Sequence, residues 1–247
     1  MNKKIRFLDI NIDAITMQET LDKVEHAIKS KKQIHHTVVN AGKIVMMQTD
    51  KELQKSVVEA DIINADGQAV VWAANFLGLN LPERVSGIDL MEELVNKSFK
   101  NGYKCFFLGA TQEVVTNLVD LYTEQYSEDI FAGYRNGYFE KKDEEKVAIK
   151  IAESGANILF VAITSPKKEI FLNTYKKHLK SINFIMGVGG SFDVIAGKVK
   201  RAPLWMQKIG LEWFYRVIQE PKRMWKRYLI GNTKFIWLLI KAYFNSK

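Results

Sequence analysis

The fold is decided by the stretch KCFFLGATQEVVTNLVDLYTEQY, residues 104–126. It starts with an apolar run of the length of a buried strand, and Gly109 follows directly after that run. From Thr111 to Tyr126 the apolar residues recur at helical spacing. The stretch therefore predicts a strand, a glycine turn and an amphipathic helix, which together form one unit of a parallel sheet covered by helices.

The same alternation extends in both directions along the chain. Further apolar runs of strand length occupy residues 34–40, 61–64, 158–163 and 182–188. Helical spacing is found from residue 41 onward and in residues 89–100, 143–154 and 166–179. Thr16 and Glu19 have the spacing of a capping box, which predicts a helix start after Thr16. The sequence therefore predicts an α/β fold for the body of the chain.

The pattern changes near residues 195–200. No later segment resembles a strand, and helices are expected over residues 204–209, 211–219, 221–230 and 233–244. We therefore divide the chain into an α/β domain, residues 1–196, and a helical appendage, residues 197–247.

The positive charge is concentrated near the C-terminus. The chain has a net charge of +8, and residues 216–247 carry eight basic side chains against one acidic side chain, Glu220. This window therefore holds a charge of +7 and leaves +1 for the rest of the chain. A basic segment of this kind indicates a surface that meets anions, with nucleic acid and anionic lipid as the two candidates.

Polar and glycine residues follow three of the predicted strands, and open parallel sheets bind ligands at the carboxyl ends of their strands. Asp66 is placed to act as a general base, although an aspartate there can also simply cap the next helix. Gly109, Gly187, Gly189 and Gly190 let a phosphate approach the backbone, or only permit tight turns. These positions are the candidate site.

Metal and redox chemistry have little support in the sequence. The four histidines lack the spacing of metal ligands and no Asp-x-Asp motif is present, so we expect no bound metal and no cofactor. Cys105, the only cysteine, lies in an apolar run and is expected to be a core residue. The N-terminal residues do not read as a signal peptide, and no stretch reaches the ~20 apolar residues that span a bilayer. A cytoplasmic location is therefore expected.

The chain resembles the WecG/TagA/CpsF family of bacterial glycosyltransferases from about residue 5 to residue 231. The strongest segments are GVGGSFDVIAGKVKRAP, residues 187–203, and GLEWFYRVIQEPKRMWKRYLIGN, residues 210–232. Supporting segments are VVNAGKIV (38–45), NADGQAVVWAANFLG (64–78), RVSGIDLMEEL (84–94), FFLGA (106–110) and NGYF (136–139). The resemblance implies a Rossmann-like α/β body with a helical appendage that docks near the active site and the membrane.

The resemblance also implies an activity and partners. Members of the family transfer a sugar from a UDP-sugar to an undecaprenyl-diphosphate-linked saccharide and invert the anomeric centre. N-acetylmannosamine, used for wall teichoic acid, is the best-known sugar, and other polysaccharides are built by relatives. We therefore expect a peripheral enzyme at the inner face of the plasma membrane, with its basic appendage on anionic lipid, and self-association into a homo-oligomer.

Roles for individual residues follow from the same resemblance. Asp66 matches the family's proposed catalytic base, and Asn40 and Arg84 match pocket residues, the arginine being suited to the charge of a diphosphate. Gly109 and residues 187–190 match positions where the nucleotide should lie. The appendage adds three basic positions that could reach the diphosphates, Arg216, Arg223 and Arg227.

Two positions depart from the teichoic-acid members. Val38 stands where they typically carry threonine, two residues before Asn40, and Lys168 stands where they carry a pocket glutamine. An extra cation could meet a uronate, so the donor sugar stays open. UDP-N-acetylmannosamine is the first choice, and UDP-glucose and UDP-N-acetylmannosaminuronate are the alternatives.

A basic nucleic-acid-binding protein is the alternative from a different class. No nucleic-acid-binding motif is present, and the aromatic residues of the appendage lie within apolar runs, so we expect no nucleic-acid partner.

Overall fold

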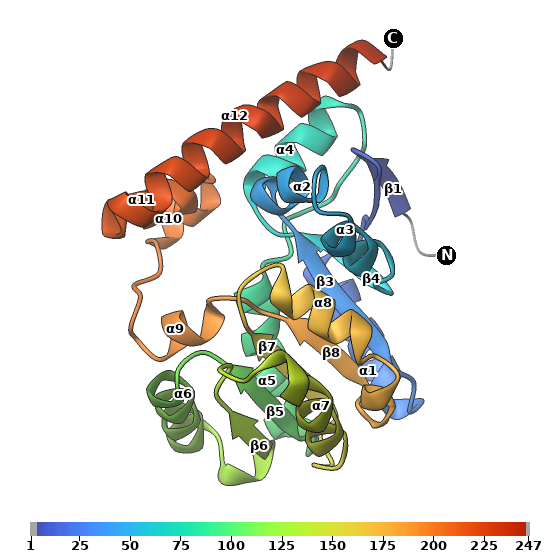
Figure 1. Cartoon of the computed structure of the whole chain (residues 1–247), viewed down its shortest axis with the longest axis vertical. Helices are drawn as coiled ribbons and strands as arrows, with labels where there is room; N and C mark the ends of the chain where they lie inside the picture. Colours follow the sequence, from blue (N-terminus) through green and yellow to red (C-terminus); the bar gives the residue numbers. More distant parts are fainter. Residues whose placement is uncertain (1–3, 246–247) are drawn as a thin grey trace.

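The predicted alternation folds into a six-stranded parallel sheet, described over residues 4–245 by a computed structural model (Figure 1). The strand order is β4-β3-β8-β7-β5-β6. The strands are β3 (Ile34–Val39), β4 (Ile62–Ala65), β5 (Cys105–Gly109), β6 (Phe131–Arg135), β7 (Ile158–Ala162) and β8 (Phe184–Gly187). A separate antiparallel hairpin, β1 (Lys4–Phe7) with β2 (Ile10–Asp13), precedes them. The α/β fold class is therefore confirmed.

Helices cover both faces of the sheet because successive strand residues point to opposite sides. Phe107 packs into a core with α1 (Met17–Lys29), α5 (Gly87–Asn101) and α6 (Gln112–Gln125), whereas Phe106 and Leu108 pack toward α7 (Glu144–Ala152) and α8 (Lys167–Thr174). A third core beside β3 and β4 contains α2 (Ala41–Met47), α3 (Lys51–Val58) and α4 (Gln68–Phe76). Three short 3₁₀ helices lie at Glu128–Ile130, Lys141–Asp143 and His178–Ser181.

Local signals place several element boundaries. The Thr16 side chain accepts a hydrogen bond from the backbone of Glu19, and the Glu19 side chain accepts one from the backbone of Thr16, so the expected capping box at the start of α1 is confirmed. The helix expected over residues 166–179 already ends at Thr174, and a 3₁₀ helix follows. Cys105 is buried in the core, as expected.

Residues 204–245 are mainly helical, and the last of these helices crosses the top of the molecule (Figure 1). After α9 (Ser191–Ile195) come α10 (Leu204–Lys208), α11 (Glu212–Gln219) and α12 (Pro221–Asn245). The two helices expected over 221–230 and 233–244 are therefore wrong, since α12 runs through Gly231 without a break. A glycine inside a helix costs only about 1 kcal/mol, which the packing of α12 along α2 can offset.

Side chains of the appendage are buried in the core of the body. Phe235 of α12 is almost fully buried in the same core as Ile44 of α2, with its ring 6.4 Å from the ring of Phe7. Met224 of α12 is also buried. The division at residues 196 and 197 therefore stays an interpretation of the sequence, and the two parts share a core. Among residues 4–245, no helix has both the length and the apolar content that crossing a bilayer would require.

We expect Phe235→Ala to lower the free energy of unfolding by about 3 kcal/mol, because removing a buried aromatic ring leaves a cavity in the core. Chemical denaturation measures this change. Phe244→Ala is the matched control on the same helix, since Phe244 is largely exposed and its loss should change stability by less than about 0.5 kcal/mol. Equal, small effects of the two substitutions would contradict the shared core.

Candidate functional site

Asn40 and Asp66 leave the sheet side by side. The parallel register pairs Val39 of β3 with Ala65 of β4, so the next residue of each strand emerges at the carboxyl edge. The backbone N–H of Asp66 donates to the Val39 carbonyl at 2.8 Å, which extends this pairing. The Asn40 side chain accepts a hydrogen bond from the Lys43 backbone N–H at 2.9 Å and caps α2. Helix α4, in contrast, is capped by Gly67 with no side-chain bond, so the alternative of Asp66 as a helix cap is wrong.

The surroundings of Asp66 favour its protonated form. Burial is the largest cause, and it raises the pKa of this carboxyl above its usual value. The positive charge of Arg84 is the next largest cause and lowers this pKa, and the negative charge of Glu212 raises it. Smaller lowering effects come from Arg216 and Lys43. A carboxylate with a raised pKa is a stronger base. Gly87 leaves room beside it, since a Cβ there would lie 3.9 Å from Asp66 Oδ2. The arrangement suits removal of a proton from a substrate hydroxyl.

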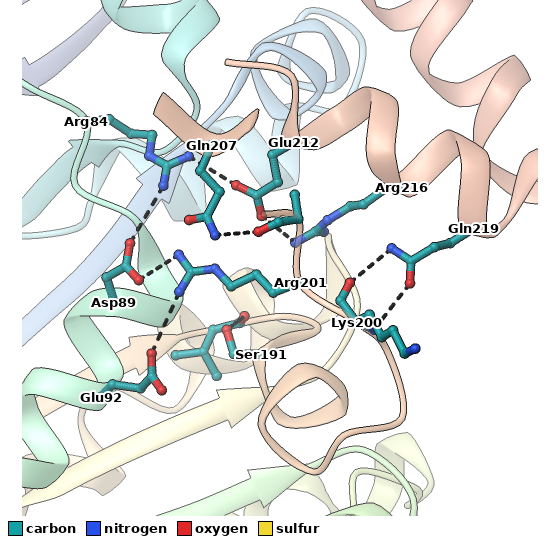
Figure 2. A network of polar contacts seen from close by, with 12 residues as sticks. Arg84, Asp89, Glu92, Ser191, Lys200, Arg201, Gln207, Glu212, Arg216 and Gln219 are labelled. Atoms are coloured by element: carbon teal, nitrogen blue, oxygen red, sulfur yellow. Dashed lines mark hydrogen bonds and ion pairs between the residues drawn. The ribbon is translucent and has the colours of Figure 1, made fainter. Parts of the chain in front are cut away.

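Arg84 is the centre of a charged network that connects the body to the appendage (Figure 2). One guanidinium nitrogen lies 3.1 Å from Glu212 of α11, and another lies 3.6 Å from Asp89 of α5. Asp89 also binds Arg201 at 2.6 Å, in the loop between α9 and α10, and Arg201 lies 3.8 Å from Glu92. Arg84 is therefore held by carboxylates from two parts of the chain.

The three appendage arginines of the predicted site are described to different extents. Arg216 lies one turn after Glu212 in α11 and contacts its carboxylate at 3.2 Å, with 42% of its side chain exposed. The structure thus brings Arg216 together with Arg84. Arg223 and Arg227 belong to α12, but their side chains lie outside the described residues.

The glycines at the strand ends have different surroundings. Gly109 has a φ of 141°, and a Cβ there would clash with the Ala162 carbonyl oxygen, so this glycine permits close approach of β5 and β7. Gly189 has a φ of 58°, and neither it nor Gly190 would place a Cβ within 4 Å of another group. The loop after β8 therefore borders open space that a ligand can occupy.

The model of the glycosyl transferase WecG/TagA/CpsF family matches residues 5–247. The chain belongs to this family. The expected family membership is confirmed, and the match favours an enzyme over a nucleic-acid-binding protein.

Two similar proteins each carry the name N-acetylglucosaminyldiphosphoundecaprenol N-acetyl-beta-D-mannosaminyltransferase. The protein from Bacillus spizizenii is 36% identical over 182 residues, which are 74% of this chain and 69% of the relative. The protein from Bacillus subtilis is 35% identical over 198 residues, which are 80% of this chain and 75% of the relative.

Lys168, which stands where the teichoic-acid members of the family carry glutamine, belongs to a buried charged cluster. Its ammonium lies 2.7 Å from Glu169, and Lys43 of α2 lies at the same distance from the same carboxylate. Lys168 also donates to the Ser165 hydroxyl, and a Cβ at Gly187 would lie 2.9 Å from its stem. Burial alone would raise the pKa of Glu169, but the two lysines outweigh it and lower that pKa to about 2.

The cluster has two lysines and one carboxylate, so it keeps one net positive charge near the end of β8. The carboxylate of a uronate donor would be attracted by this net charge. The Lys168 ammonium itself already contacts Glu169. The role of Lys168 in choosing the donor sugar stays a prediction.

Sequence reasoning did not single out Glu212, Asp89, Lys43 or Glu169. Glu212 lies in residues 210–232, a segment that carries the family resemblance, and it is one of two acidic residues in residues 204–247. An isolated acidic residue in a basic segment could have indicated a role for Glu212. The contact from Glu212 to Arg84 spans 128 positions and could not be read from the sequence.

Across the described part of the chain, no group of three or more His, Cys, Asp or Glu side chains could hold a metal ion. A cavity of about 590 Å³ opens between α5, α6 and α9, lined in part by Glu92, Tyr122 and Arg201. None of the predicted site residues is among those that line it.

Proposed function

We propose that the chain is an inverting glycosyltransferase that moves a hexose from a UDP-sugar to an undecaprenyl-diphosphate-linked sugar. N-acetylmannosamine is the first choice for the hexose, because both relatives are named as mannosaminyltransferases. The observation that supports this proposal best is Asp66, a carboxyl group with a raised pKa beside Arg84 and Arg216 at the carboxyl edge of the sheet.

The chemistry is a single displacement. Asp66 takes the proton of the acceptor hydroxyl as its oxygen forms a bond to C1 of the sugar. The bond from C1 to the UDP oxygen breaks on the opposite side, so the anomeric centre is inverted and UDP leaves with the electron pair. Positive charge near the departing diphosphate stabilises it, and Arg84, Arg216 and the net positive charge of the Lys43, Lys168 and Glu169 cluster are the sources offered by this chain.

Binding a diphosphate near Arg84 has to compete with an existing contact. Arg84 has only 14% of its side chain exposed and already holds Glu212 and Asp89. Arg216 has an exposed portion in addition to its contact with Glu212. We therefore propose that Arg216 contacts the diphosphate directly. Arg84 would stabilise the diphosphate through its positive charge without contacting it.

A donor panel tests the proposal. The full chain is incubated with an N-acetylglucosaminyl-diphosphate-polyprenol acceptor and, separately, UDP-N-acetylmannosamine, UDP-glucose and UDP-N-acetylmannosaminuronate. We expect release of UDP and a β-linked product with the first donor, at a rate at least about 10-fold above the others. Preference for the uronate would support the alternative donor and a role for Lys168. Lack of transfer from every donor would contradict the proposed function.

We also propose that α12 places the enzyme on an anionic membrane surface at the cytoplasmic side. At 3.6 residues per turn, its four exposed lysines at 222, 226, 234 and 241 fall within roughly a third of the helix circumference. Exposed apolar side chains share this outer side, and Trp237, Ile240 and Phe244 are among them. A helix with basic and apolar side chains interleaved on its outer side suits the headgroup layer of a bilayer.

A homo-oligomer is proposed from the resemblance alone. Sedimentation at micromolar concentration is the measurement, and a purely monomeric protein would contradict it.

A further inference from the structure

Glu212 connects the two parts of the chain at the candidate site. One oxygen of its carboxylate lies 3.1 Å from Arg84 of the body, and the other lies 3.2 Å from Arg216 of the appendage. Figure 2 shows this carboxylate between the two guanidinium groups. Both oxygens are thus used by cations, and one of these cations is largely buried. Contacts of a partly buried carboxylate with two arginines are charge-assisted and fix all three side chains.

The start of α11 is also held by packing. Gly210, two residues before Glu212, lies against the Trp72 ring of α4, where a Cβ would approach the ring to 2.8 Å. Further along, Gln219 of α11 exchanges two hydrogen bonds with the Lys200 backbone, at 3.0 and 3.2 Å. The position of Glu212 is therefore determined by contacts on both sides of it.

The negative charge of Glu212 affects the basicity of Asp66. Four charged groups act on Asp66: Arg84 from the segment before α5, Lys43 from α2, and Glu212 and Arg216 from α11. Three of the four are positive and favour ionised Asp66, so alone they would make it a weaker base. Glu212 is the one negative charge among them.

We propose that Glu212 is a positioning residue of the transfer reaction, which holds Arg84 and Arg216 at the site and offsets their positive charge beside Asp66. The inference rests on the proposed function. It explains how one site keeps arginines for a diphosphate and a basic carboxylate for a hydroxyl proton at close quarters. Without Glu212 the arginines would be less fixed, and Asp66 would give up its proton more readily and take one less readily.

The test compares Glu212→Gln with Glu212→Asp and with Glu92→Gln as the matched control. Glu92 also pairs with an arginine of this network, Arg201, but it is not among the groups that act on Asp66. The measurement is the pH dependence of kcat/KM for the full chain with its donor and lipid acceptor. Thermal melting of each variant checks that it is folded.

With Glu212→Gln we expect the acidic limb of the profile to move to lower pH by roughly half a unit or more, because a negative charge beside Asp66 has been removed. We expect its plateau to fall by about 10-fold, because Arg84 and Arg216 are no longer fixed by Glu212 and because a weaker base transfers the proton less well. Glu212→Asp keeps the charge and should keep the acidic limb of the wild type, and Glu92→Gln should match the wild type in both respects. An acidic limb unmoved by Glu212→Gln would overturn the inference.

A second measurement decides the inference independently of turnover. In protein labelled with ¹³C at the aspartate carboxyl carbons, Asp66→Asn identifies the Asp66 signal, whose titration is then followed in the wild type and in Glu212→Gln. A lower midpoint in the variant supports the inference, and an equal midpoint overturns it. If the wild type transfers no sugar from any donor, the proposed function fails, and the titration still decides whether Glu212 sets the basicity of Asp66.

Discussion

Replacing Asp66 by Asn is expected to lower kcat by about 10³-fold while the protein stays folded. The amide has nearly the shape of the carboxyl group but cannot accept the proton of an acceptor hydroxyl, and general base catalysis contributes about 10²–10⁴-fold. Steady-state release of UDP with the lipid acceptor measures the loss. Turnover within about 10-fold of the wild type would contradict the role of Asp66 as the base.

The matched control is Asp61→Asn at the other end of the same strand. Asp61 directly precedes β4, where its carboxylate accepts from the His35 backbone N–H at 2.8 Å and pairs with Lys176 at 2.9 Å. These contacts are far along the strand from the carboxyl edge. We therefore expect a small loss of stability and a turnover close to that of the wild type.

The stability of the Asp66→Asn variant gives an independent check. Because the pKa of Asp66 is raised above its usual 3.8 by burial, the folded state holds the proton more tightly than the unfolded chain does. Between the two pKa values the wild type therefore loses stability as the pH rises, and the asparagine variant does not. We expect the variant to melt at or above the temperature of the wild type from about pH 4 upward. A clear loss of stability at neutral pH would indicate a structural role.

The sequence was informative where local patterns determine structure. Apolar runs followed by helical spacing correctly predicted five strands of the sheet, and Thr16 with Glu19 predicted the start of α1. The edge strand β6 was missed, because FAGYR contains Gly133 and has no fully buried position. The other edge strand, β4, is buried at every position and could be predicted, so the weak apolar signal of β6 comes from its own residues.

The site was predictable in part for the same reason. Asn40 and Asp66 could be found because each follows a strand, but their adjacency depends on the register of β3 with β4, which no local pattern encodes. The contacts of Glu212 with Arg84, and of Phe235 with Phe7, join residues more than a hundred positions apart. Such contacts follow from how the appendage packs on the body, which the periodicity of the sequence does not determine.

Removing the four exposed lysines of α12 is expected to weaken binding to anionic vesicles by about 10³-fold. The variant replaces Lys222, Lys226, Lys234 and Lys241 by Gln. Each basic side chain near an anionic bilayer contributes about 1 kcal/mol, and about 1.4 kcal/mol corresponds to a tenfold change in affinity. The substitutions leave Phe235 and the inner side of α12 unchanged, so the fold should be retained.

The measurement is co-sedimentation of the full chain with vesicles of phosphatidylglycerol and phosphatidylcholine, at low and high salt. A control variant removes the same charge from exposed lysines of the body, Lys100, Lys150, Lys177 and Lys180, and should bind the vesicles as the wild type does. High salt should weaken the wild type more than the α12 variant, because screening acts on the charges that the variant lacks. If the α12 variant binds as tightly as the wild type, or if both variants lose the same affinity, α12 is not the surface that meets the membrane.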